Sequence, residues 1–215
     1  MTLDIQTDRR LVREAGQSTR FALLSFTAPD TTRAASRPPL NVAFVIDRSG
    51  SMGGSKIALA REAVIQALRM LRESDRFSIV AYDHEIDVLV PSTHASLEAL
   101  RNASSRVNEL QARGNTDLSG GWLKGCEQIA EHPGAGQTTR CLLLSDGLAN
   151  AGIVDREELA GHSRALGERG IKTSCLGIGN DYDERLLEAI ATSRRAFVRC
   201  RDRGPDPRHP DERAG

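Results

Sequence analysis

The stretch NVAFVIDRSGSM, residues 41–52, decides the fold. It opens with an apolar run, 42–46, that is rich in β-branched residues and closely followed by glycine, which predicts a fully buried strand of a parallel sheet. Asp47, Ser49 and Ser51 come next, at the carboxyl end of that strand, where open α/β sheets bind their ligands. One carboxylate and two hydroxyls are oxygen donors of the kind that suits Mg²⁺ or Mn²⁺.

Strand-like and helix-like patterns alternate on the carboxyl side of this stretch. Further strands are predicted over residues 77–82, 85–90, 139–145 and 171–177. Amphipathic helices are predicted over residues 56–71, 96–109, 118–131, 155–169 and 182–192. The strand over 85–90 alternates charged and apolar residues and is expected to end at Pro91, which is typical of a half-exposed edge strand. The fold class is therefore α/β: a doubly wound, mostly parallel sheet with one antiparallel edge strand and helices on both faces.

The amino-terminal part of the chain has a different pattern. Residues 1–30 are predicted to form a short β-rich segment, with its best strand over 20–27 and shorter candidates at 3–7 and 10–13. So few strands are marginal alone and need a partner to pack against. Residues 31–40 are rich in Ser, Thr and Pro and are read as a linker, which leaves residues 41–200 as the main domain.

The composition argues against several classes of protein. Of the 215 residues, 29 are basic and 29 are acidic, so the net charge of zero gives no support for binding nucleic acid or a membrane surface. The first residues lack a basic start followed by an apolar core, and no run is long enough to span a bilayer, so we expect a cytoplasmic protein. The cysteines at 126, 141, 175 and 200 form no CxxC and are expected to be reduced and buried.

Three polar loops are expected on one rim of the sheet. They contain Asp47, Ser49 and Ser51, then Thr116 within GNTD, then Asp146 within SDG. Each motif alone is a common turn sequence. Together they supply two carboxylates and three hydroxyls that can converge on one octahedral ion. Scattered histidines without HxxxH or HxH spacing, and the absence of GxGxxG and GxxxxGK[ST], argue against a zinc site and a nucleotide site.

The order and separation of DRSGSM, GNT and SDG resemble the metal-ion-dependent adhesion site (MIDAS) of a von Willebrand factor type A domain. The resemblance covers about residues 41–192, and it is closest to bacterial intracellular-type proteins in which β-rich segments flank such a domain. It implies that Ser49 and Ser51 bind the metal directly and that Thr116 does so when a ligand is engaged. Asp47 and Asp146 would act mostly through water and by orienting the serines.

The resemblance also implies the partner, which would be a protein that presents an Asp or Glu carboxylate to the ion. An ion that touches few protein carboxylates keeps enough positive charge to attract an incoming one. The protein is thus expected to be a binding module and not an enzyme. The alternative is a Mg²⁺-dependent hydrolase or phosphotransferase with Asp47 as nucleophile, against which stands the lack of a lysine or general base in the three loops. A scaffold with a vestigial metal site is a third interpretation.

The carboxyl end does not fit the pattern. Residues 194–215 are crowded with Arg, Pro and Asp, and residues 201–215 are expected to be disordered. Two interpretations stay open: a genuine basic tail, or a frame-shifted reading of the usual continuation. With freely chosen codons, the tail read one nucleotide later gives a strand, an acidic turn and an amphipathic helix. On the second interpretation the sheet may lack its final strand, together with a carboxyl-terminal β-rich partner for residues 1–30.

Overall fold

The computed structural model describes residues 2–7, 22–27, 37–146, 149–179, 182–192 and 197–200. The chain divides into two compact units, Met1–Arg37 and Pro38–Gly215. In the first unit, β1 (Thr2–Thr7) pairs antiparallel with β2 (Ala22–Thr27), in the register Thr2 opposite Thr27. These two strands were predicted, whereas the candidate strand at 10–13 lies outside the described residues.

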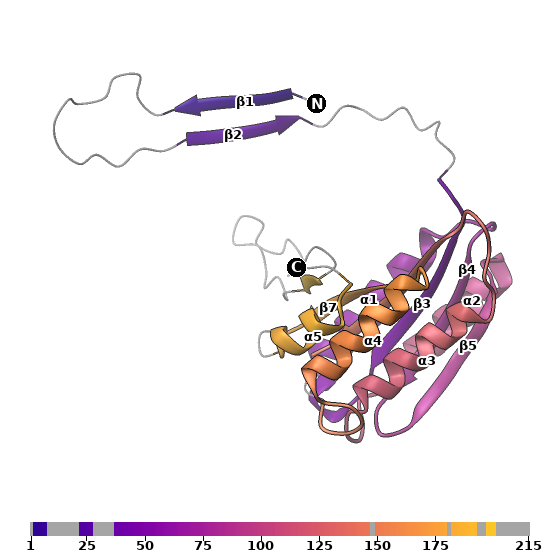
Figure 1. Cartoon of the computed structure of the whole chain (residues 1–215). Coiled ribbons are helices and arrows are strands. Elements are labelled where there is room, and N and C mark those ends of the chain that lie inside the picture. The colour runs from indigo at the N-terminus through magenta and orange to yellow at the C-terminus, as the bar shows by residue number, and fades with distance from the viewer. Residues whose placement is uncertain are drawn as a thin grey trace, which may run out of the picture. The chain divides into compact units, whose positions relative to one another are not determined.

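The second unit is built on a six-stranded sheet in the order β5-β4-β3-β6-β7-β8 (Figure 1). The central strand is the predicted apolar run, and all pairings are parallel except that of the edge strand β5 with β4. The strands are β3 (Leu40–Asp47), β4 (Arg76–Tyr82), β5 (Ile86–His94), β6 (Thr138–Ser145), β7 (Lys172–Ile178) and β8 (Phe197–Cys200). The predicted fold class is confirmed.

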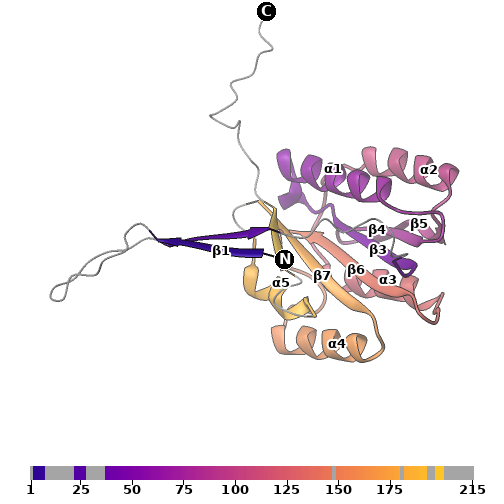
Figure 2. The same cartoon turned by 90° about the horizontal axis from the view of Figure 1, so that it is seen from above.

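Helices cover both faces of this sheet (Figure 2). One face carries α1 (Ser55–Arg69) and α2 (Leu97–Asn108), and the other carries α3 (Leu118–Ala130), α4 (Arg156–Glu168) and α5 (Glu184–Ile190). Because successive side chains of a strand point to opposite faces, Phe44 packs in the core beneath α1 and α2, while Val45 packs in the core beneath α3. Each such fully buried side chain contributes about 1.5–3 kcal/mol.

Helix α3 lies very close to the sheet because it presents glycine there. A Cβ built on Gly121 would lie 2.3 Å from the ring of Tyr82, and one on Gly125 would lie 2.2 Å from Val45 Cγ2. Any larger side chain at either position would push the helix away from β3 and β4. This close approach fixes the Tyr82 ring, which takes part in the site described below.

Two features of the sheet edges were not foreseen. Strand β5 does not end at Pro91 but continues to His94, because Pro91 lies where the pairing with β4 changes register and no ladder hydrogen bond from its nitrogen is needed. At the other edge, β8 is present as a four-residue parallel strand, so the sheet has a strand beyond β7. Residues 201–215, with the two interpretations of the tail, lie outside the described residues.

The parallel register brings the carboxyl ends of β3 and β6 together, since Ile46 lies opposite Leu144. The loops after both strands therefore meet on one rim. A short 3₁₀ helix, η1 (Gly50–Met52), forms the first turn of the loop after β3. Among the described residues, no helix is both long enough and apolar enough to cross a membrane.

Candidate metal centre

Asp47 connects the loop after β3 to the neighbouring strands. Its carboxyl group is fully buried at the end of β3. Oδ1 accepts a hydrogen bond from the Ser49 backbone nitrogen at 2.8 Å. Oδ2 accepts hydrogen bonds from Ser145 Oγ at 2.6 Å and from Tyr82 Oη at 3.3 Å. Asp47 therefore holds the turn that carries the serines and joins it to strands β4 and β6.

Ser49, Ser51 and Asp146 form a continuous row of oxygen atoms. Ser49 Oγ lies 3.1 Å from Ser51 Oγ, and Ser51 Oγ donates to Asp146 Oδ1, also at 3.1 Å. Ser49 and Asp146 are buried, whereas Ser51, which lies between them, is exposed, so the row reaches solvent at its middle. The structure thus brings together four of the residues that the sequence predicted for the site.

Thr116, the fifth predicted residue, is buried and held through its backbone. Its nitrogen donates to Asn150 Oδ1 at 2.8 Å, and its carbonyl oxygen accepts from the Ala151 nitrogen at 3.1 Å. Its loop also contacts the serine turn directly, because the Gly50 nitrogen donates to the Gly114 carbonyl at 3.0 Å. The second loop is therefore joined to the first and third by backbone hydrogen bonds.

The spacing of these oxygens matches the needs of a small cation. Mg²⁺ binds oxygen ligands octahedrally at about 2.0–2.1 Å, so adjacent ligands lie roughly 3.0 Å apart. The separations of 3.1 Å along the row are close to that value. The donors named for the site are all oxygens, which suits Mg²⁺ or Mn²⁺ better than a soft metal. The residues present therefore fit a divalent cation.

Burial raises the pKa of Asp47, and the negative charge of Asp146 raises it further, although hydrogen bonds from Ser145 and Ser49 act in the opposite direction. Burial and the nearby negative charge both disfavour the ionised form of Asp47. A cation bound at the rim would reduce this penalty, so metal binding and proton release at Asp47 are expected to be linked.

Sequence reasoning missed four residues that hold the site together. Ser145 could have been found, because it stands directly before Asp146 in the SDG motif. Tyr82 and Asn150 act across strands and loops and leave no local signal. Lys56 is the most informative, because its Nζ lies 3.1 Å from Asp146 Oδ2. No lysine lies within the three loops, but this one reaches them from the first turn of α1.

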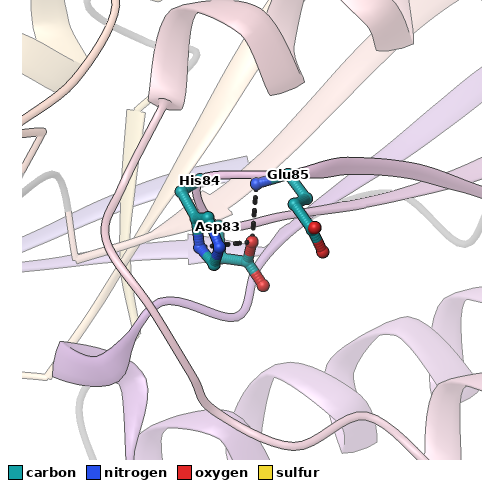
Figure 3. Close-up of side chains that lie close together, drawn as sticks. All are labelled: Asp83, His84 and Glu85. Atoms are coloured by element: carbon teal, nitrogen blue, oxygen red, sulfur yellow. Dashed lines mark hydrogen bonds and ion pairs between the residues drawn. The ribbon is translucent and has the colours of Figure 1, made fainter.

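A second group of possible metal ligands lies beside the rim, at the turn after β4. Asp83, His84 and Glu85 each offer an atom within 4.8 Å of the others. Asp83 lies between the His84 ring and the Glu85 backbone nitrogen (Figure 3). Its Oδ1 is 3.1 Å from His84 Nδ1 and accepts from Glu85 N at 2.6 Å.

The Asp83 carboxylate is already saturated by other partners. Its Oδ2 accepts from Arg48 Nε at 2.9 Å and from Arg113 Nε at 2.8 Å. Arg113 also binds the Glu85 carboxylate at 2.8 Å. Two guanidinium groups leave little attraction for a further cation, so this turn is read as a structural ion-pair network and not as the metal centre.

Other residues of these elements have structural roles. Asp117 and Asp155 accept from Gly120 N and Glu158 N as the N-caps of α3 and α4. Trp122 is fully buried, and its Nε1 donates to Thr173 Oγ1 at 3.0 Å. Cys126, Cys141 and Cys175 are free and buried, as expected.

The comparison with protein families gives one match over most of the chain. The family described as "von Willebrand factor type A domain" matches residues 41–204. Inter-alpha-trypsin inhibitor heavy chain H3 of Rattus norvegicus is 32% identical over 170 residues, which cover 75% of this chain and 19% of that protein. The uncharacterized protein YfbK of Escherichia coli is 31% identical over 156 residues, covering 72% of this chain and 27% of the relative. The chain thus spans only a minor part of these relatives.

Solved structures share the fold. A von Willebrand factor type A protein from Catenulispora acidiphila is 26% identical, with a TM-score of 0.63, over 79% of this chain and 39% of that chain. Proximal thread matrix protein 1 from the mussel byssus, solved with a zinc-occupied MIDAS motif, has a TM-score of 0.62 over 77% of this chain and 44% of its own. At 17% identity the latter shows the fold alone.

Proposed function

Since this chain belongs to the von Willebrand factor type A domain family, whose domains are generally interaction modules, we propose that it binds a partner protein through a divalent cation. The cation is Mg²⁺ or Mn²⁺, and the partner contributes an Asp or Glu carboxylate. The proposal rests above all on the row of oxygens from Ser49 through Ser51 to Asp146. Asp47 supports the row, and Thr116 completes the set.

The chemistry of these donors explains why a carboxylate is the expected ligand. The bound cation supplies an electrophilic centre at the rim. Hydroxyl groups neutralise less of its charge than carboxylates would, so the centre keeps its affinity for an anionic oxygen. Ser51, in the middle of the row, is exposed, which leaves the row open to a partner there. The mussel protein with zinc in its MIDAS motif is a precedent for a metal in this fold.

The hydrolase alternative gains no support from the geometry of Asp47. A nucleophilic carboxylate needs an oxygen that a substrate can approach. Asp47 is fully buried, Oδ1 accepts from Ser49, and Oδ2 accepts from Ser145 and Tyr82. Lys56 contacts Asp146 and not Asp47. These contacts favour a structural role for Asp47 in the loop.

The metal part of the proposal is tested by titrating Mn²⁺ and counting the free ion by electron paramagnetic resonance. Asp47→Ala and Ser49→Ala should weaken binding by about tenfold to a hundredfold, since changes in and around a metal shell have effects of that size. Ser104→Ala is a matched control, because Ser104 lies in α2 and its hydroxyl donates to the Leu100 carbonyl of the same helix. Binding that is unchanged in both site variants would overturn the assignment.

The ligand part is tested with small probes on the Mn²⁺-loaded protein. Acetate should displace a metal-bound water and reduce the water-proton relaxation enhancement, whereas neutral acetamide should not. Equal effects of the two probes would contradict carboxylate recognition. Phosphatase turnover that requires Asp47 would instead support the hydrolase.

A further inference from the structure

Lys56 joins the first turn of α1 to the loop after β6. Its ammonium group lies 3.1 Å from Asp146 Oδ2, and the two residues are separated by 90 positions in the chain. The lysine side chain is only 18% exposed and the aspartate side chain is fully buried. The pair is therefore largely withdrawn from water, where such contacts are screened less than at the surface.

The two oxygens of Asp146 have different surroundings. Oδ1 accepts from Ser51 and belongs to the row of oxygens, whereas Oδ2 contacts Lys56. A lysine here differs from the arginines that bind Asp83, because an ammonium group is a compact point charge that makes no bidentate bond to the carboxylate. Asp146 can thus keep Oδ1 directed to the serines while Lys56 reduces its negative charge.

The balance of charge at the rim changes with this lysine. The ammonium group adds one positive charge beside a cation that its hydroxyl ligands neutralise only in part. An incoming carboxylate would therefore meet a more positive rim than it would without the lysine.

We propose that Lys56 is a specificity-determining residue of this rim, which weakens the binding of the cation alone and strengthens the binding of an anionic ligand to the loaded centre. This inference rests on the proposed function. The physical cause is the same in both directions: a fixed positive charge repels a cation nearby and attracts a carboxylate. Lys56 thereby favours the state in which metal and partner are bound together.

The test compares Lys56→Gln, which removes the charge and keeps a hydrogen-bond donor, with Lys56→Arg, which keeps the charge. Lys56→Gln should bind Mn²⁺ about tenfold more tightly, the size expected for one nearby charge, and its loaded form should bind acetate more weakly than the wild type does. Lys56→Arg should resemble the wild type in both measurements. Thermal unfolding in EDTA provides a further readout, because Lys56→Gln should lower the unfolding temperature of the metal-free protein and enlarge its increase on adding Mn²⁺.

The outcomes separate the two proposals. If the wild type binds Mn²⁺ through Ser49 but Lys56→Gln binds it equally or more weakly, the inference about Lys56 is wrong and the proposed function stands. If the wild type binds no Mn²⁺, or if Ser49→Ala has no effect, both proposals fail. A drop in acetate affinity that also occurs in Lys56→Arg would show that lysine positions Asp146 by shape and not by charge.

Discussion

Asp47 ends strand β3, and Asp83 directly follows the neighbouring strand β4, so the two lie at the same edge of the sheet. Both carboxyl groups are fully buried. Asp83 is bound by two arginine side chains, whereas Asp47 is bound by hydroxyl groups and a backbone nitrogen. The pKa values differ accordingly: that of Asp47 is raised, chiefly by burial. For Asp83 burial also acts to raise the pKa, but hydrogen bonds from Glu85 and Arg113 and the charge of Arg48 lower it overall.

The two carboxylates differ in how their charge is balanced. Asp83 has its charge balanced within the protein, and it joins three segments, since Arg48 comes from the loop after β3 and Arg113 from the loop before α3. Asp47 and Asp146 have hydroxyl neighbours that add no charge, and Lys56 contacts Asp146. Proximity of acidic groups alone would instead select the Asp83 turn.

The largest effect on stability is expected from Asp83→Asn. The change leaves Arg48 and Arg113 without their buried counter-charge, and breaking a buried ion pair from one side costs about 3–5 kcal/mol. Chemical denaturation should therefore show a loss of that size in the free energy of unfolding.

Asp87→Asn is the matched control for that change. Asp87 also contacts Arg48, but its side chain is 49% exposed, so the loss should stay below about 1 kcal/mol. Equal losses in the two variants would contradict the view that Asp83 is the structural centre of the network.

A smaller effect is expected from Gly121→Ala, which tests the packing between the two clusters. The added methyl group would overlap the Tyr82 ring. The Tyr82 hydroxyl donates to Asp47, and the Tyr82 backbone carbonyl accepts from Arg48 N. Overpacking of this kind costs about 1–3 kcal/mol, and Mn²⁺ affinity should fall as Tyr82 is displaced.

Gly161→Ala makes the same change in α4, where a Cβ meets nothing within 4 Å. It should stabilise the protein by about 0.5–1 kcal/mol through helix propensity. If Gly121→Ala and Gly161→Ala change the stability equally, α3 leaves room for a methyl group beside Tyr82, which would contradict the close packing.

The opposite pKa directions predict an order of events on acidification. Protons compete with the cation at Asp47, whose pKa is raised, so Mn²⁺ affinity should fall at a pH above the ordinary range of aspartate. The stabilisation from Asp83, whose pKa is lowered, is fully present above its unfolded value of about 3.9 and is lost as the pH falls through the folded value.

Metal binding should therefore be lost while the protein is still folded. Parallel Mn²⁺ titrations and circular dichroism across the acid range test this order. Loss of binding only at the pH of acid unfolding would contradict it.

The sequence was sufficient for the fold, and it placed the proposed ion-binding residues in loops of one rim, because both signals are local. An apolar run followed by DRSGSM specifies both a buried strand and its polar end, and GNT and SDG occupy loops that a parallel sheet brings to the same rim. The helix caps Asp117 and Asp155 are local in the same way, since each accepts from a nitrogen three residues further on.

Interactions between distant segments were not predictable. Arg48 and Arg113 reach Asp83 across 35 and 30 positions, and no local pattern marks either contact. Lys56 reaches Asp146 across 90 positions. Pro91 was expected to end its strand, because a change of register against β4 cannot be seen in one strand alone. The sequence thus indicates which side chains could bind an ion. It does not indicate which of them already have a counter-charge within the protein.

The central claim is that the cation binds at the serine row and not at the Asp83 turn. The most direct test is the Mn²⁺ dissociation constant of two single-site variants, Ser49→Ala and Glu85→Gln, measured beside the wild type. Ser49→Ala should weaken binding by about tenfold or more, while Glu85→Gln, at an exposed carboxylate bound to Arg113, should leave it unchanged. Binding that survives Ser49→Ala and is lost in Glu85→Gln would place the cation at the turn and contradict this account.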